Sequence, residues 1–478
     1  MHRNLPYNKK DPFSIEAYAK GLTGSSLRSL YGNDIENVYS GKGKLGQLVE
    51  FLYFSYKPNS NPEPDFLEAG VELKVTPIKK NSKGLVSKER LVFNIIDFEK
   101  EYKFSFKESS FWKKNSLLLL LFYLHEKEKT DIDYLFKIAR LWRFPLTDLK
   151  IIKDDWNTIV SKIKSGKAHE ISEGDTLYLG ACTKGSTALK SKRTQPFSNK
   201  KAQQRAFSLK SKYLNFIIAK SLKGDYNLTK LDDEYLQFLE EDSEVLNEPA
   251  IGYGSLFEDH ELIIKNISEY KKGQTFEDVI IEKFSKYYGY SEQELIDKFK
   301  LKINLKAKNK NYVFAKSILG ITKGKIEEFE KAEIELKTIK LQPTGTLKES
   351  MSFAQIKYKE IINEVWEESY WYNKLTKRFF FVVFQKDEKK IARLKKVMFW
   401  TMPAKDLKIA EKFWQHTKIN ILKGDYEAFW KLKDHKICHV RPKGVNSKDL
   451  METPQGNFEK KKSYWLNSRY ILKQIIND

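Results

Sequence analysis

The sequence predicts an α/β (α+β) protein made of two related domains, each with a mixed central sheet flanked by helices. Three observations support this fold class. The chain has 478 residues, which is long for a single core, and 41% of them are hydrophobic, enough to pack two interiors. From Pro12 to about Lys220, short apolar runs alternate with amphipathic segments. The second half then repeats the motifs of the first half in the same order.

The repeat consists of three pairs of similar segments. They are DFLEAGVELK at 65 with EFEKAEIELK at 328, WKKNS at 112 with WYNKL at 371, and SLKSKYL at 208 with WLNSRYI at 465. Chance similarity between two lysine-rich strands explains one match, but not three that keep their order and spacing. The repeat therefore predicts two homologous domains.

A locally acidic segment separates the two repeats. EYLQFLEEDSEVLNEPAIGYGSLFEDHE, residues 234–261, also contains turn-forming proline and glycine. This composition favours a linker, although a surface helix and loop inside one domain would look the same. We expect a catalytic domain at residues 1–225, an acidic linker at 226–264 and a second domain at 265–478.

The charge of the chain favours a polyanionic partner. Lys and Arg outnumber Asp and Glu by 86 to 64, which gives a net charge of +22. Nucleic acid is the commonest partner of such a protein, although solvated lysine faces are a plainer explanation. Two cysteines suit a reducing compartment, MHRNLPYNKKDPF has no signal-peptide core, and the apolar run at 117–124 is too short to span a bilayer. We expect a soluble, cytoplasmic protein in which this run is a buried strand.

The segment VELKV at 71–75 carries the candidate active site. Its alternation of apolar and charged residues is typical of a strand, so Glu72 and Lys74 project from the same side. Asp65 lies seven residues before Glu72, and a hairpin turn at Gly70 would bring the two carboxylates together. Converging carboxylates favour Mg²⁺, and a neighbouring lysine can orient water and stabilise charge in metal-assisted phosphodiester hydrolysis. A surface strand with salt bridges is the alternative explanation of the bare pattern.

Two further residues could complete this site. GQLVEFL at 46–52 has the apolar spacing of a helix and places Glu50 as a third carboxylate, or as an ordinary helix acid. Lys113 precedes the leucine run and would bring a second ammonium near the phosphate, or serve as a plain lysine at a strand end.

Together these segments resemble the PD-(D/E)xK nucleases, and within them the branch that contains the mismatch-repair nickase MutH and the Sau3A-type restriction endonucleases. That branch combines a K-G-x-x-G-x-x-x-E helix, a D-x6-E-x-K hairpin and a later lysine before an apolar strand. The counterparts here are KGKLGQLVE at 42–50, DFLEAGVELK at 65–74 and Lys113. The resemblance covers most of the first half, and the two-domain length matches the restriction endonucleases.

The resemblance implies a type II restriction endonuclease that cleaves double-stranded DNA at GATC, with Mg²⁺ or Mn²⁺, and leaves 5′-phosphate ends. The implied roles are DNA contact for Lys42 and Gly43, metal binding for Asp65 and Glu72, and catalytic assistance for Glu50, Lys74 and Lys113. A cognate DNA methyltransferase acting on the same site is also implied. With one active site per chain, cutting both strands requires dimerisation on DNA or sequential nicking. The sequence has no Walker loop or helicase motif, so we expect no ATP requirement.

The second repeat is predicted to lack catalysis. Glu335 and Lys337 match the catalytic pattern, but the counterpart of Asp65 is Glu328, whose longer side chain displaces the carboxylate. NYVFAKSILG at 311–320 has no convincing acid in place of Glu50.

The second repeat nevertheless keeps a predicted DNA-reading segment. HVRPKG resembles the R-P-K loop of the MutH branch, and Arg suits bidentate contact with guanine, although a phosphate contact is the alternative. KKKSYW interleaves cations and aromatics in the same way as a duplex-facing segment. The predicted DNA contacts here are Arg441, Pro442, Lys443, Tyr464 and Trp465. The first repeat has LGACTKG at 179–185, where Lys184 is the candidate.

These features give one preferred function and two alternatives. We expect the second domain to bind a further copy of the recognition site and activate the first domain as an allosteric effector, unless it only adds affinity or stability. The alternatives are a non-catalytic DNA-binding protein derived from nuclease domains and a MutH-like repair nickase. The segment HKICH at 435–439 lacks a second ligand pair at zinc spacing, so we expect Cys182 and Cys438 to be structural.

Overall fold

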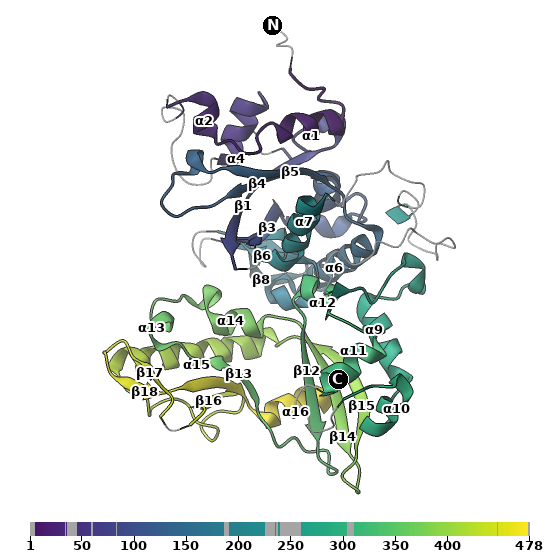
Figure 1. Cartoon of the computed structure of the whole chain (residues 1–478), viewed down its shortest axis with the longest axis vertical. Coiled ribbons are helices and arrows are strands. Elements are labelled where there is room, and N and C mark those ends of the chain that lie inside the picture. The colour runs from purple at the N-terminus through teal and green to yellow at the C-terminus, as the bar shows by residue number, and fades with distance from the viewer. Residues whose placement is uncertain are drawn as a thin grey trace. The chain divides into compact units, whose positions relative to one another are not determined.

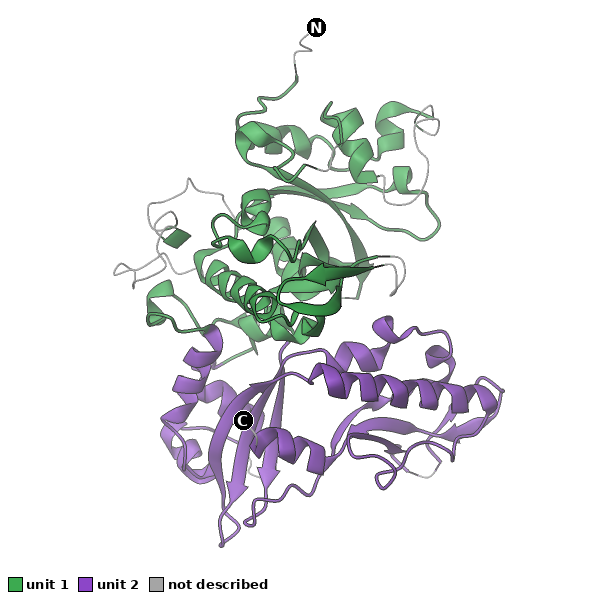
Figure 2. Cartoon of the chain, turned by 180° about the vertical axis from the view of Figure 1, so that it is seen from behind, with its two compact units in different colours: residues 1–275, 323–333 green, residues 276–322, 334–478 purple. Residues whose placement is uncertain are grey.

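The chain forms two compact bodies in the computed structural model (Figure 2). Unit 1 comprises residues 1–275 and 323–333, and unit 2 comprises residues 276–322 and 334–478. The described residues are 5–33, 35, 45–58, 61–82, 84–185, 191–224, 235, 238–239, 260–303, 310–446 and 448–476. Among them, no helix combines the length and the apolarity that crossing a membrane would require.

The first sheet of unit 1 is mixed and has the strand order β2-β1-β4-β5. Its strands are β1 (Glu72–Asn81), β2 (Gly84–Ser87), β4 (Leu118–Leu124) and β5 (Phe136–Trp142). β1 runs parallel to β4, and β2 and β5 are antiparallel edges. Residues 118–122 of β4 have no exposed surface, because a central strand is covered on both faces. The expected buried strand is therefore confirmed.

Helices cover one face of this sheet (Figure 1). They are α1 (Pro12–Lys20), α2 (Leu27–Tyr31) and α4 (Leu45–Leu48). Their apolar residues share one core with alternate residues of the strands, among them Leu73, Leu119 and Leu121. α1 begins at Pro12, and the side chain of Asp11 caps it by accepting the backbone N–H of Phe13 at 3.0 Å.

The second sheet of unit 1 is antiparallel, with the order β3-β9-β6. Its strands are β3 (Leu91–Ile95), β6 (Leu179–Thr183) and β9 (Arg205–Leu209), and the hairpin of β7 (Lys192–Gln195) and β8 (Ser198–Gln203) lies between β6 and β9 in the chain. The helices of this half are α5 (Ser110–Asn115), α6 (Leu146–Lys164) and α7 (Ser211–Lys223).

Unit 2 repeats this architecture. Its mixed sheet has the order β12-β14-β15, with β12 (Glu335–Leu341), β14 (Phe379–Lys386) and β15 (Ala392–Trp400). Its antiparallel sheet has the order β13-β19-β16, with β13 (Met351–Gln355), β16 (Cys438–Pro442) and β19 (Lys462–Leu466), beside the hairpin of β17 (Leu450–Glu452) and β18 (Phe458–Lys460). Its helices are α9 (Phe276–Ser285), α10 (Glu292–Phe299), α11 (Lys310–Ile318), α13 (Tyr358–Ile361), α14 (Tyr370–Leu375), α15 (Ala404–Lys423) and α16 (Ser468–Ile476).

Matching contacts confirm that the two units are repeats. β12 runs parallel to β14 as β1 runs parallel to β4. In unit 1, the hydroxyl of Tyr213 on α7 donates to Asp148 on α6 at 2.7 Å. In unit 2, the hydroxyl of Tyr470 on α16 donates to Asp406 on α15 at 2.8 Å. The predicted fold of two tandem domains with mixed sheets is therefore confirmed.

One segment of the second repeat belongs to unit 1. β11 (Lys325–Ile326) pairs with β10 (His260–Glu261), and α12 (Glu327–Ala332) follows directly. Lys331 on α12 is buried and bridges Asp148 and Glu327, with both N–O distances at 2.9 Å. Residues 323–333 therefore lie in unit 1, whereas the sequence placed them inside the second domain at 265–478. The buried charge of Lys331 holds this segment against Asp148, because a buried charge needs its partners close by.

Candidate active site

Asp65 and Glu72 meet at the start of β1 because the chain reverses between them. Phe66 and Val71 form a single antiparallel bridge, and Gly70 adopts a left-handed conformation with φ of +65°. The backbone N–H of Asp65 donates to Oε2 of Glu72 at 3.2 Å, and the N–H of Leu73 donates to Oδ2 of Asp65 at 2.9 Å. The expected hairpin is thus reduced to one bridge, yet it places the two acids side by side.

Two lysines neutralise Glu72, which is only 3% exposed. The Nζ of Lys74 lies 2.6 Å from Oε1 of Glu72, as the alternation along β1 predicts. The Nζ of Lys114 lies 3.8 Å from Oε2 of Glu72 and donates to the carbonyl of Asn61 at 2.7 Å.

The prediction of Lys113 for this site needs correction. Lys113 is exposed, and its Nζ lies 5.9 Å from the ring centre of Phe104. Ser109 caps α5 by accepting the N–H of Trp112 at 3.0 Å, which sets the phase of the helix. Successive helical residues point about 100° apart, so Lys113 and Lys114 point in different directions. The rotation of α5 that the cap sets directs Lys114 to Glu72.

Glu50 is the third acid of the cluster. It lies in a π-helical turn, Val49–Tyr53, that continues α4, and such turns are frequent at functional sites. Burial raises the pKa of Glu50 to about 7, and the nearby charges of Asp65 and Glu72 add to the rise. Burial also raises the pKa of Glu72. Glu50 therefore lies within electrostatic reach of both predicted metal ligands.

This cluster fits a divalent cation by charge and by donor type. The charge of Asp65 raises the pKa of both Glu50 and Glu72, and this repulsion is the penalty that a cation between the carboxylates would remove. Their hard oxygen atoms are the donors that Mg²⁺ prefers. Within the described ranges, however, no three His, Cys, Asp or Glu side chains already form a metal cage. The residues that would hold the ion are Asp65 and Glu72, with Glu50 close by.

The second repeat keeps the same pair of lysines. In unit 2, Nζ of Lys337 lies 3.3 Å from Oε2 of Glu335, and Lys374 on α14 contacts the same carboxylate. Ser369 caps α14 through the N–H of Tyr372 at 3.1 Å, just as Ser109 caps α5. Lys374 is therefore the counterpart of Lys114, and the alignment of WKKNS with WYNKL is shifted by one residue.

Glu328, the counterpart of Asp65 in the second repeat, binds backbone groups. Glu328 belongs to unit 1, whereas Glu335 belongs to unit 2. Oε1 of Glu328 accepts the backbone N–H groups of Ile263 and Ile264 at 2.8 and 2.9 Å. The side chain is 3% exposed, and burial raises its pKa to about 8. The change from Asp to Glu thus accompanies a structural role.

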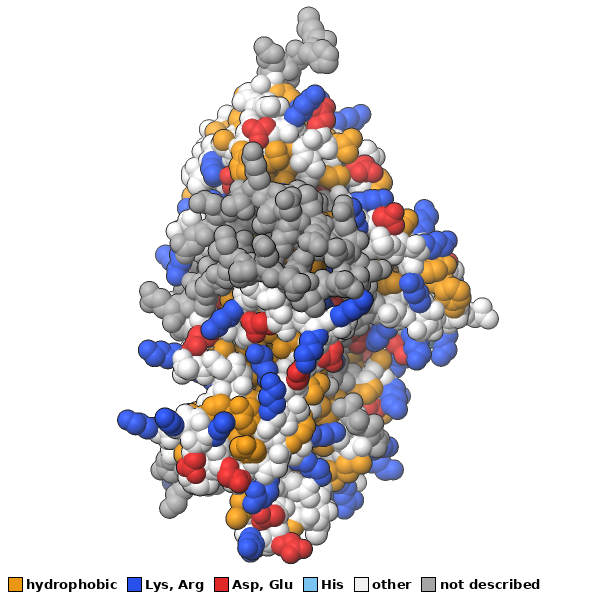
Figure 3. All heavy atoms as spheres, turned by 90° about the vertical axis from the view of Figure 1, so that its right-hand side faces the viewer, with side chains coloured by type: hydrophobic (Ala, Val, Ile, Leu, Met, Phe, Trp, Pro, Cys, Tyr) orange, Lys and Arg blue, Asp and Glu red, His pale blue; other side chains and the backbone are white. Residues whose placement is uncertain are grey.

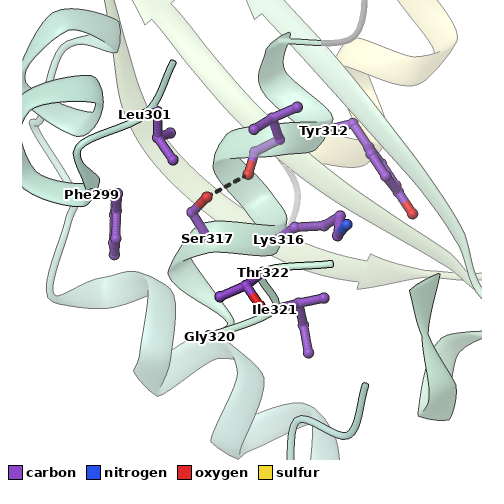
Figure 4. Close-up of a pocket in the computed structure, with 9 residues that line it drawn as sticks. Phe299, Leu301, Tyr312, Lys316, Ser317, Gly320, Ile321 and Thr322 are labelled. Atoms are coloured by element: carbon purple, nitrogen blue, oxygen red, sulfur yellow. Dashed lines mark hydrogen bonds between the residues drawn. The ribbon is translucent and has the colours of Figure 1, made fainter. Parts of the chain in front are cut away.

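Helix α11 of unit 2 takes the place of the helix that carries Glu50, and it borders a pocket instead of an acidic site (Figure 4). The pocket has a volume of about 430 Å³ and no acidic lining residue. The hydroxyl of Ser317 in its wall donates to the carbonyl of Val313 at 3.0 Å. As the sequence predicts, this helix supplies no acid there.

Arg441 and Lys443 present a cationic surface at the end of β16. Both are exposed, and they lie over the ring of Trp465 at 4.5 and 5.7 Å from its centre. Pro442 between them is also exposed. Tyr464, which the sequence also predicts as a DNA contact, is by contrast 3% exposed and stacks on Trp371. Adjacent residues of β19 face opposite sides, and the side of Tyr464 is the core.

Strand register identifies the equivalent positions in unit 1. Cys438 pairs with Leu466, and Leu179 pairs with Leu209, so Arg441 corresponds to Cys182. Cys182 and Cys438 are both free and buried. Burial agrees with the structural role that the sequence predicts for them. Lys184 corresponds to Lys443 and is half-buried. Lys42 and Gly43 lie outside the described residues.

Two separate segments of the chain match one known protein family. The family model of the DNA mismatch repair enzyme MutH matches residues 54–155 and 321–412, one segment in each repeat. The type II restriction enzyme Sau3AI of Staphylococcus aureus is 36% identical over 97% of this chain and 98% of its own length. This chain belongs to the MutH/Sau3AI endonuclease family.

MutH proteins match a smaller part of the chain. The DNA mismatch repair protein MutH of Shewanella woodyi is 26% identical over 36% of this chain and 76% of its own length. The MutH of Shewanella amazonensis is 29% identical over 37% of this chain and 80% of its own length. The resemblance predicted from the sequence motifs is confirmed, and the length of the match agrees with the two-domain branch of the MutH/Sau3AI family.

Proposed function

We propose that this protein is a type II restriction endonuclease that cleaves double-stranded DNA at GATC by Mg²⁺-dependent hydrolysis and leaves 5′-phosphates. The observation that carries the proposal is the cluster of Asp65, Glu72 and Lys74, joined by Glu50 and Lys114 in unit 1. The likeness to Sau3AI over nearly the whole of both chains supports it.

The residues divide the chemistry among them. Asp65 and Glu72 would hold the Mg²⁺, which when bound would polarise the phosphate and acidify a water molecule. Glu50 can take up a proton near neutral pH, because its pKa is about 7. Lys74 and Lys114 carry ammonium groups that can orient the attacking water and stabilise negative charge on the phosphate.

The second domain would act as an effector that binds a further GATC copy. The counterpart of Asp65 is Glu328, whose carboxylate accepts two backbone N–H groups of unit 1, and this argues against a second cutting site. Arg441 and Lys443 retain an exposed cationic surface suited to guanine and phosphate. Dimerisation on DNA and a cognate methyltransferase for the same sequence belong to this proposal.

Plasmids with one or two unmethylated GATC sites test the proposal. The purified chain with Mg²⁺ should produce linear DNA without ATP, and D65A should bind but not cut. Nicked circles as the end product would favour a repair nickase, and tight binding without cutting would favour a non-catalytic protein. Faster cutting of two-site DNA, or activation by an added GATC duplex, is expected of an effector domain. Equal rates in every case would remove the effector role.

A further inference from the structure

The hairpin of β7 and β8 in unit 1 is strongly basic. It carries Lys192, Arg193, Lys200 and Lys201, all exposed, and the sequence from 192 to 203 has no acidic residue. Within the part of the chain that the structure describes, the three lysines form no ion pair. The three lysine charges repel one another, and an anionic partner would remove this cost.

The equivalent hairpin of unit 2 lacks this charge. β17 and β18 occupy the same place between β16 and β19, but residues 450–460 contain one lysine and two glutamates. One of these, Glu452, pairs with Lys359 at 2.6 Å. Each repeat therefore has cations where the other lacks them. Unit 1 has the basic hairpin, and unit 2 has Arg441 at the position of the buried Cys182.

The basic hairpin starts beside Lys184, the predicted DNA contact of unit 1. The N–H of Lys184 donates to the carbonyl of Gln204 at 2.9 Å, and the N–H of Gln204 donates to the carbonyl of Ser191 at 2.7 Å. The ladder of β6 and β9 therefore leads directly into the hairpin. Lys and Arg are scattered over the face drawn in Figure 3, so net charge alone does not identify a DNA-binding surface. The direct connection between Lys184 and the basic hairpin identifies it better.

Contacts with two neighbouring segments also anchor the hairpin to unit 1. Buried Gln195 accepts the N–H of Ala168 at 2.7 Å through Oε1, and its Nε2 contacts the carbonyl of Lys200. At the turn, the carbonyl oxygen of Phe197 would lie 2.5 Å from any Cβ at Gly166, which also has φ of +66°. Only glycine fits this contact. A fixed ribbon loses little conformational entropy when it binds a partner.

We propose that the β7–β8 hairpin is a duplex-binding ribbon of the catalytic unit, whose cations contact DNA phosphates and supply affinity where unit 1 lacks the arginine of unit 2. This inference rests on the proposed endonuclease function. A two-stranded ribbon is one of the elements that the major groove admits, and contacts of Lys and Arg with phosphates fix the register of a protein on the duplex.

The test compares two triple variants of the full-length protein that remove equal charge. K192Q/K200Q/K201Q alters the hairpin, and K405Q/K408Q/K412Q alters exposed lysines of α15 in unit 2. Binding to a fluorescent GATC duplex is measured without Mg²⁺ over a range of salt concentrations. Each lost phosphate contact lowers the slope of log K against log salt by about 0.9, so the hairpin variant should lose up to about 3 in slope. The α15 variant should change little.

Single-turnover cleavage at saturating protein separates this inference from the proposed function. As the protein concentration is raised to saturation, the hairpin variant should reach its half-maximal rate later than the wild type, because its lost phosphate contacts weaken binding to the duplex. An unchanged slope, or an equal loss in both variants, would overturn the hairpin assignment while wild-type cleavage still stood. A wild type that neither binds nor cuts the duplex would overturn the endonuclease proposal, and the hairpin inference with it.

Discussion

Exchanging the adjacent lysines of α5 for alanine separates the two candidates for the second active-site cation. Lys114 is 14% exposed, and its Nζ lies 3.8 Å from the carboxylate of Glu72. Lys113 is exposed and lies beside the ring of Phe104. We expect K114A to cripple cleavage and K113A to leave it almost unchanged, although the two residues are neighbours in the chain.

The distance in the structure sets the magnitude. A unit charge at 3.8 Å contributes about 1 kcal/mol in bulk water and about 4 kcal/mol at an effective dielectric constant of about 20. Because about 1.4 kcal/mol corresponds to a tenfold rate change, K114A should slow single-turnover cleavage by roughly 5- to 700-fold. K113A should stay within about twofold of wild type, as is typical of an exposed charge.

The assay is single-turnover cleavage of a GATC duplex at several Mg²⁺ concentrations, with circular dichroism to confirm folding. Lys114 neutralises Glu72 when no cation is bound, so its removal should not weaken Mg²⁺ binding. The half-saturating Mg²⁺ concentration should therefore stay constant or fall in K114A while the maximal rate drops. A normal rate for K114A together with a large loss for K113A would refute the assignment of these residues.

Three other predictions follow from the structure. E335A should cut at nearly the wild-type rate, and E328D should add no second cutting activity, because residue 328 is buried and accepts the backbone N–H groups of residues 263 and 264. The carboxyl of Glu50 is protonated below its pKa of about 7 and charged above it. The half-saturating Mg²⁺ concentration should therefore rise as pH falls below about 7, by at most about tenfold per pH unit. E50Q should flatten this dependence. D148A should lower the free energy of unfolding in urea by about 3 kcal/mol or more, because it removes a partner of buried Lys331.

The sequence predicted the parts of the site that depend on local geometry. The alternation along β1 places Glu72 and Lys74 on one side, and the short return at Gly70 brings Asp65 to them, so spacing alone carries this information. Lys114 escaped prediction because the cap at Ser109 sets the phase of a short helix, and two adjacent lysines cannot be told apart by composition.

Other features depend on contacts between residues distant in the sequence. The cation–aromatic KKKSYW pattern gave no sign that Tyr464 stacks on Trp371 in the core. Nor could the linear repeat show that α12 packs into unit 1, because that depends on Lys331 meeting Asp148, a partner 183 residues away. The pattern of residues along a strand or helix predicts which side chains share a face of that element. It does not predict which of those faces another element covers.

The contacts of Glu328 are the reason that we expect no single substitution to make the second copy catalytic. In unit 1, Asp65 accepts the N–H of Leu73 within its own turn and stays beside Glu72. Glu328 instead satisfies two backbone N–H groups of residues 263 and 264, and α12 is fixed in unit 1 by the buried charge of Lys331. Shortening residue 328 to aspartate would leave those donors without an acceptor, at a cost of about 1–3 kcal/mol for each buried group. The residue at the position of Asp65 in the second repeat therefore serves as a structural anchor of unit 1.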